Sequence, residues 1–132
     1  MNVIISVALA TIIRIALGML WYSPSVFGSA WMKTIKISPK DIKPKDAQIA
    51  ILGGVLSSII ISAMLSCLMT RLGIHSVLSG FFLGLSIWFG FVAMNQFGGI
   101  LWEKKSFQWF AITTGYECAA YAISGSILAY FA

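Results

Sequence analysis

Four polar residues interrupt the long apolar runs of this 132-residue chain, and they are its candidates for chemistry: Arg14, Asn95, Glu117 and Tyr121. An ionisable side chain held deep in an apolar environment is costly, so it indicates a functional site or a buried pair. For Glu117 both interpretations stay open at this point. It is either a group that binds or transfers something, or a carboxyl that is protonated or paired between helices.

No motif for nucleophilic catalysis, phosphate binding or metal binding is present, so we predict no catalytic residue, no metal site and no cofactor. Cys67 and Cys118 both fall inside apolar runs without Cys-x-x-Cys spacing. This placement is typical of thiols packed as small apolar groups.

The composition indicates a membrane protein. Hydrophobic residues make up 59% of the chain and charged residues 10%, whereas about a quarter of the residues of a soluble domain are charged. The net charge of +5 arises largely from lysines that directly follow an apolar run, between Lys33 and Lys45. Such clusters face anionic lipid headgroups in the cytoplasm. We therefore expect the lipid bilayer as a partner, and we do not expect nucleic acid.

Since a span needs about 20 apolar residues, we predict one all-α integral membrane domain of four transmembrane helices over residues 1–132. The predicted spans cover about residues 3–21, 47–69, 77–97 and 106–130. We expect Gly98 and Gly99 to end the third. Small residues recur along one face of the second span, at Gly54, Ser58, Ser62 and Ser66. Small-residue faces on the second and fourth spans predict close helix packing and give candidate interfaces for a homo-oligomer.

The basic residues predict the orientation. The loops 22–46 and 98–105 contain all the lysines, whereas the loop between the second and third spans contains only Arg71. The positive-inside rule places the two lysine-bearing loops in the cytoplasm and both termini outside. We expect a multi-pass protein of the bacterial inner membrane.

An aromatic segment follows the first span, in the interfacial stretch 23–45. Ser23 and Pro24 form a helix-start pair of N-cap and first helical residue. Phe27, Trp31 and Ile35 then recur every four residues, which predicts a short amphipathic helix in the plane of the headgroups. An irregular loop with buried aromatic residues is the alternative.

The same segment carries a family resemblance, in a motif of seven residues: Trp21, Tyr22, Ser23, Pro24, Phe27, Gly28 and Trp31. With Met32 after it, with Gly84 and Trp88, and with Gly115 and Tyr116, the chain resembles a bacterial membrane family catalogued as domain of unknown function 1761. The resemblance covers essentially the whole chain. It implies a four-span membrane protein and no assigned activity. Relatives often carry histidine where this chain has Glu117, and Arg14 is unusual for the first span.

The depths of the two ionisable residues predict that they meet. Arg14 lies eight residues before Tyr22, roughly 12 Å from the inner interface at 1.5 Å per residue. Glu117 lies eleven residues after Ser106, roughly 16 Å from the same interface. An arginine spans that difference, so we predict an Arg14–Glu117 ion pair, within or between subunits, with Tyr121 as a further partner. The alternative is that the side chain of Arg14 extends toward the inner headgroups while Glu117 stays protonated.

Three classes of function remain open. The first is a small oligomeric membrane protein that transports a small solute or ion, because four spans alone are too few to enclose a pathway. The second is a membrane-embedded enzyme or binding protein for a lipid or lipophilic substrate. The third is an accessory subunit of a larger membrane complex. A ligand pocket near Glu117 favours the second class, and a polar axial cavity favours the first.

Overall fold

The computed structural model describes residues 2–132, and this range contains helices and no strand. The elements in chain order are α1 (Val3–Trp21), α2 (Gly28–Thr34), the 3-10 turn η1 (Pro39–Asp41), α3 (Pro44–Leu72), α4 (Val77–Ile87), the π-helical stretch η2 (Trp88–Ala93), α5 (Met94–Leu101) and α6 (Phe107–Tyr130). The elements α4, η2 and α5 follow one another without a gap and form one long helix.

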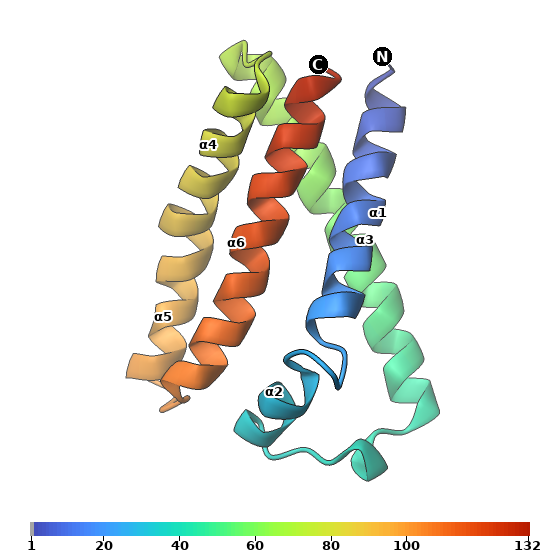
Figure 1. The fold of residues 1–132 in the computed structure, drawn as a ribbon, viewed down its shortest axis with the longest axis vertical. Coiled ribbons are helices and arrows are strands. Elements are labelled where there is room, and N and C mark those ends of the chain that lie inside the picture. Colours follow the sequence, from blue (N-terminus) through green and yellow to red (C-terminus); the bar gives the residue numbers. More distant parts are fainter. Residues whose placement is uncertain (1) are drawn as a thin grey trace.

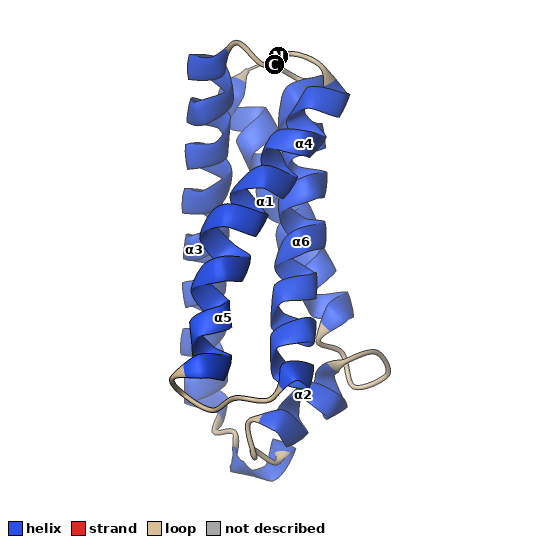
Figure 2. Cartoon of the chain, turned by 90° about the vertical axis from the view of Figure 1, so that its left-hand side faces the viewer, coloured by secondary structure: helices blue, strands red, loops and turns tan. Residues whose placement is uncertain are grey.

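The long helices run along one axis, and the chain ends meet at one end of the molecule (Figure 1). We call this the terminal end, and the opposite end, which holds α2 and the α5–α6 connection, the loop end. Figure 2 shows the same arrangement from the side, with the labelled termini together. Each long helix is therefore antiparallel to the one that follows it.

Among residues 2–132, three helices are long and apolar enough to cross a membrane: α1, α3 and the long helix Val77–Leu101. The helix α6 has sufficient length, with 24 residues, but polar side chains such as Gln108, Thr113 and Glu117 lower its mean hydropathy. The membrane-helix character predicted from the sequence is confirmed. The fourth span stays a prediction.

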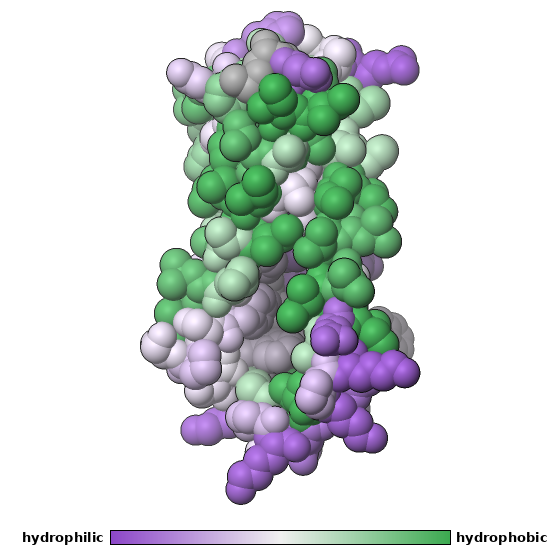
Figure 3. All heavy atoms as spheres, turned by 90° about the vertical axis from the view of Figure 1, so that its right-hand side faces the viewer, coloured by the Kyte–Doolittle hydropathy of each residue, from purple (hydrophilic) through white to green (hydrophobic). Residues whose placement is uncertain are grey.

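The apolar side chains of these three helices point mostly outward. Only 22%, 17% and 17% of the residues in their most apolar stretches are buried inside the molecule. Figure 3 shows the result on one face, where an apolar belt lies between hydrophilic ends. A protein in water would hide this surface, whereas lipid tails solvate it without cost.

The helix α6 lies at the centre and contacts α1 to α5. Its closest neighbour is α4, because glycines remove the side chains between the two backbones. A Cβ atom at Gly80 would collide with the carbonyl oxygen of Gly125, and one at Gly84 would collide with that of Tyr121. Small residues spaced four apart allow this approach in a membrane helix pair.

The buried apolar core lies toward the terminal end. It joins α1, α3 and α6 through five fully packed residues: Ala10, Leu65, Met69, Leu128 and Ala129. The small-residue stripe of α3 faces the same interior, since Ser58, Ser62 and Ser66 are all buried within the chain. These three serines therefore pack within the chain, as predicted, whereas Gly54 is exposed. The role of the stripe as an oligomer interface stays a prediction.

Two helices have boundaries that differ from the sequence prediction. The pair Gly98–Gly99 does not end the third long helix, which continues to Leu101. Gly99 instead leaves room for the ring of Trp109, which a Cβ atom would crowd. The helix α3 extends beyond the predicted 47–69 at both ends, from Pro44 to the left-handed Gly73 that caps it.

Gly80→Ala tests the α4–α6 contact. We expect the substitution to lower the free energy of unfolding by about 1–3 kcal/mol, because the methyl group must push two backbones apart. Gly90→Ala is the matched control on the same long helix, since its Cβ atom meets no other atom within 4 Å. Unfolding in mixed micelles of increasing SDS content, followed by tryptophan fluorescence, measures both. Equal stability of the two variants would contradict the packing.

Candidate functional site

The two ionisable residues of the apolar runs form an ion pair within one chain. The Nη2 atom of Arg14 lies 2.9 Å from Oε2 of Glu117. The side chain of Arg14 is 2% exposed and that of Glu117 is 23% exposed. The predicted pair between α1 and α6 is therefore confirmed, and it lies within a single subunit.

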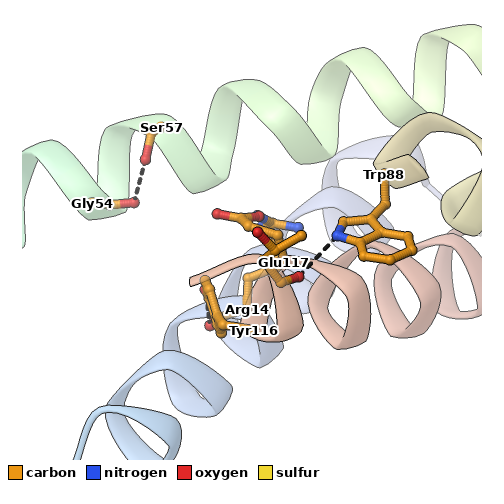
Figure 4. Close-up of polar contacts among 7 residues, drawn as sticks. Arg14, Gly54, Ser57, Trp88, Tyr116 and Glu117 are labelled. Carbon is orange, nitrogen blue, oxygen red and sulfur yellow. Dashed lines mark hydrogen bonds and ion pairs between the residues drawn. The ribbon is translucent and has the colours of Figure 1, made fainter. Parts of the chain in front are cut away.

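Two tyrosines of α6 hold Arg14 in place. The hydroxyl of Tyr116 donates a hydrogen bond of 2.9 Å to the backbone carbonyl of Arg14. The guanidinium carbon of Arg14 lies 4.8 Å from the ring centroid of Tyr121, a distance at which a cation is attracted to the face of the ring. Tyr121 is thus a partner of the pair through its ring. Figure 4 shows Arg14, Tyr116 and Glu117 gathered where α1 and α6 meet.

The pair leaves part of the guanidinium unsatisfied. Nε and Nη1 of Arg14 are buried and have no hydrogen-bond partner among residues 2–132. Nearly all buried polar atoms in proteins have a partner, so an unpaired one calls for an explanation. The hydroxyls of Ser62 and Ser124 are in the same situation, and both residues are 0% exposed.

A second polar contact joins the π-helical stretch to α6. The indole Nε1 of Trp88 donates a hydrogen bond of 2.8 Å to the carbonyl of Thr114, and Figure 4 shows Trp88 directed from the long helix Val77–Leu101 toward α6. The hydroxyl of Thr114 donates in turn to Oε1 of Gln96, at 2.7 Å. Stretches of π-helix often mark functional positions in helices.

Asn95, which the sequence analysis selected, does not join this group. It is exposed on the outside of the long helix, and its neighbour Gln96 makes the inward contact instead. The π-helix Trp88–Ala93 changes the α-helical phase here, and no feature of the sequence announced it.

The aromatic motif forms a compact turn at the loop end. The rings of Trp21 and Phe27 lie 4.8 Å apart, and those of Tyr22 and Trp31 lie 5.3 Å apart. Gly28 packs so tightly against the end of α1 that a Cβ atom there would collide with the carbonyl of Tyr22. The motif therefore folds the chain back beneath α1.

The predicted helix start at Ser23 and Pro24 is wrong. The helix α2 begins at Gly28, and residues 22–27 form the turn before it. The hydroxyl of Ser23 donates to the carbonyl of Leu20, at 2.8 Å, and so closes α1 instead of capping α2. The backbone carbonyl of Ser23 accepts a hydrogen bond of 2.9 Å from the N–H of Gly28. The aromatic contacts of Phe27 and Trp31 require this turn, and they outweigh the local capping preference.

A groove of about 600 Å³ opens between α1, α3 and α6, above α2. Its walls are mainly apolar, with aromatic side chains at the loop end. The lining residues used below are Gly18, Tyr22, Trp31, Val55, Ser58 and Tyr116. Figure 3 shows a hollow in the lower half of the face that α1 and α3 present.

Tyr22 stands at the mouth of this groove, at the end of α1. Burial raises the pKa of its hydroxyl, and the nearby Glu117 and Tyr116 shift that pKa in the same direction. The phenol is therefore neutral over the physiological pH range and offers the groove an uncharged hydroxyl.

A smaller apolar groove of about 340 Å³ lies on the other side of the pair, between α3 and the long helix Val77–Leu101. Tyr121 lines it together with apolar residues such as Met64 and Phe91. Tyr116 and Tyr121 thus separate the ion pair from two apolar grooves. In the described part of the chain, no three His, Cys, Asp or Glu side chains gather as they would around a metal ion.

These features define an all-helical protein of membrane type, in which a buried ion pair lies beside an apolar groove. Residues 5–129 match the family described as "Protein of unknown function (DUF1761)", so the chain belongs to this family. The resemblance seen in the aromatic motif is thereby confirmed. No curated protein and no solved structure matches the chain.

A double-mutant cycle tests the ion pair. Arg14→Gln and Glu117→Gln should each destabilise the protein by about 3–5 kcal/mol, because each leaves the other charge buried without a partner. The double variant should lose less than the sum of the two, since no stranded charge remains. Unfolding in SDS measures all three variants. Additive losses would show that the two side chains do not interact in the folded protein.

Proposed function

We propose that this protein is a four-span integral membrane protein that binds a lipophilic small molecule in the groove between α1, α3 and α6. The observation that carries the proposal is the groove itself. It has the volume of a small-molecule site, an apolar lining with aromatic residues at one end, and a position beside the ion pair.

The fourth span of this proposal is α6. Its polar residues Thr114 and Glu117 face partners on other helices, so the helix needs little apolar character of its own. It is also enclosed by α1, α3 and α4, the helices that carry the apolar outer surface. A membrane helix at the centre of a four-helix bundle contacts protein on most sides. Its side chains therefore need not be apolar for the sake of contact with lipid.

The orientation follows from where the lysines lie. The loops 22–46 and 98–105 are both at the loop end, away from both termini (Figure 1). We propose that the loop end faces the cytoplasm of a bacterial cell, where Lys33 and its neighbours meet anionic lipid headgroups. Trp109, whose ring lies 4.4 Å from Nζ of Lys105, has the interfacial place that aromatic residues favour.

The groove favours a binding protein or an enzyme over an accessory subunit. A binding site for a lipophilic molecule accounts for the apolar walls and for the aromatic residues at the mouth, Tyr22 and Trp31. An enzyme acting on such a molecule would use the same groove, with Glu117 as the nearest acid. An accessory subunit would need neither groove nor ion pair.

Transport of a small solute or ion is our second candidate. It is favoured by the buried hydroxyls of Ser62 and Ser124, which lie in the interior together with the ion pair. A pathway through this protein would require a symmetric homo-oligomer, because one chain has too few helices to surround it. A second copy could pack against the outward apolar faces of α1 and α3. Leu56 is one of the exposed residues on the face of α3.

Single cysteines at Lys40 and His75 test the topology. Position 40 lies in η1 at the loop end, and position 75 lies in the turn between α3 and α4 at the terminal end. We expect a membrane-impermeant maleimide to label position 75 in intact cells and position 40 only after lysis. Labelling of both from one side would overturn the four-span arrangement.

Filling the groove tests the binding site. We expect Val55→Trp to abolish the retention of 1-phenyldodecane by the purified protein, measured by native mass spectrometry, because the indole occupies the groove volume. Leu56→Trp is the matched control, since the neighbouring residue is 59% exposed on the outer face of the same helix. Equal retention by the two variants would mean that the probe does not bind in the groove.

A further inference from the structure

The indole of Trp31 carries a polar atom without a partner at the mouth of the groove. Its side chain forms part of the groove wall, and its Nε1 is buried and has no hydrogen-bond partner among residues 2–132. By contrast, the indoles of Trp21 and Trp88 both donate to backbone carbonyls of α6. An indole N–H is a donor only, and a buried one normally has an acceptor. The mouth of the groove therefore lacks an acceptor that the chain itself does not provide.

Tyr22 adds a second polar group at the same end of the groove. Its ring makes an edge-on contact with the ring of Trp31, at 5.3 Å between centroids. Its hydroxyl can donate or accept a hydrogen bond. At the inner end, the hydroxyl of Tyr116 is already bonded to the carbonyl of Arg14. The polar atoms at the mouth are thus better placed to hold the polar part of a ligand.

The groove offers no charge to a ligand. Among the described residues, those that line it include none with an ionised side chain. A carboxylate or phosphate inside the groove would lose its hydration and find no opposite charge, which is costly. An uncharged acceptor, such as the carbonyl oxygen of an ester, accepts a hydrogen bond from an N–H group without that penalty.

The groove opens sideways, toward the surface that we assign to lipid. Two further lining residues, Met19 of α1 and Ile51 of α3, are 73% and 65% exposed. A lipophilic molecule can therefore enter from the bilayer without passing through water. Trp31 lies at the loop end, where aromatic side chains of membrane proteins collect at the interface. The ester groups of glycerolipids lie at this same depth, between the headgroups and the acyl chains.

We propose that the groove binds one acyl chain of a glycerolipid from the cytoplasmic leaflet, with the ester carbonyl accepting a hydrogen bond from Nε1 of Trp31. This inference rests on the proposed function and names the chemical class of its ligand. Neighbouring atoms cover Nε1, so the indole turns within the groove wall as the bond forms. The ester lies beside the hydroxyl of Tyr22, and the chain runs along Val55 toward Ser58.

The test compares three probes with the same number of non-hydrogen atoms on the full-length protein: ethyl laurate, hexadecane and sodium myristate. Decylubiquinone is added as a carbonyl compound of another class. Native mass spectrometry from detergent micelles gives the dissociation constants. We expect ethyl laurate to bind about three- to tenfold more tightly than hexadecane, as one hydrogen bond between neutral groups provides. Tightest binding by myristate would indicate a fatty-acid site, and tightest binding by decylubiquinone a quinone site. Either result would overturn the inference.

Trp31→Phe removes the N–H group and keeps an aromatic ring in the wall. This variant should bind ethyl laurate and hexadecane with equal affinity. Trp102→Phe is the matched control, since Trp102 is 87% exposed just after α5, and it should keep the full preference for the ester.

A second readout follows the indole N–H signals of the unaltered protein by nuclear magnetic resonance. The signal that is missing in Trp31→Phe belongs to Trp31. Ethyl laurate should move this signal downfield, because its N–H becomes hydrogen-bonded, whereas hexadecane should not. A signal that responds equally to both probes would show that no bond to the ester forms.

The outcomes separate this inference from the proposed function. If Val55→Trp blocks hexadecane and ethyl laurate alike, and the ester gains nothing in the parent protein, the inference is overturned and the groove remains a binding site. If the preference for the ester persists in Trp31→Phe, the indole does not recognise it and the inference is again overturned. If Val55→Trp leaves the affinity for every probe unchanged, the groove is not the site and both proposals fail.

Discussion

The buried ion pair between Arg14 and Glu117 is the interaction on which the interior depends. Two opposite charges in an apolar medium attract each other strongly, and breaking such a buried pair costs several kcal/mol. This attraction fixes the register of α1 against α6. The contacts of Tyr116 and Tyr121 with Arg14 follow from that register, since both tyrosines flank Glu117 on α6.

The size of the side chains divides the molecule into two halves. Toward the terminal end, glycine and alanine residues such as Gly80, Gly125 and Ala129 allow the backbones of α4 and α6 to touch. Toward the loop end, the tyrosines and tryptophans of α1, α2 and α6 occupy the space between the helices. The helices α1 and α3 diverge there around the groove (Figure 1).

The aromatic motif links this open half to the surface. The indole of Trp21 donates a hydrogen bond of 3.0 Å to the carbonyl of Ile112 on α6, which anchors the turn from within. Gly28 brings α2 back under α1, and Trp31 is thereby placed at the mouth of the groove. The residues that carry the family resemblance thus build the entrance to the candidate site.

The sequence alone determined the class of the fold and the central contact. Apolar runs of membrane length specified the helices, because a bilayer accepts few other structures, and counting 1.5 Å per residue brought Arg14 and Glu117 to similar depths. Local signals failed where tertiary contacts compete with them. Ser23 and Pro24 have the chemistry of a helix start, yet the packing of Phe27 and Trp31 moved that start to Gly28. Gly98 and Gly99 read as a break, yet the ring of Trp109 fits against the continued helix.

Only the tertiary structure decided which polar residues face inward together. The π-helix turned Gln96 toward α6 and left Asn95 outside, and a one-residue change of phase is invisible to a periodic pattern. The groove is likewise a property of three helices and a turn that are distant in sequence. Its walls are ordinary apolar residues such as Val55, and nothing in their type distinguishes them from residues that face lipid.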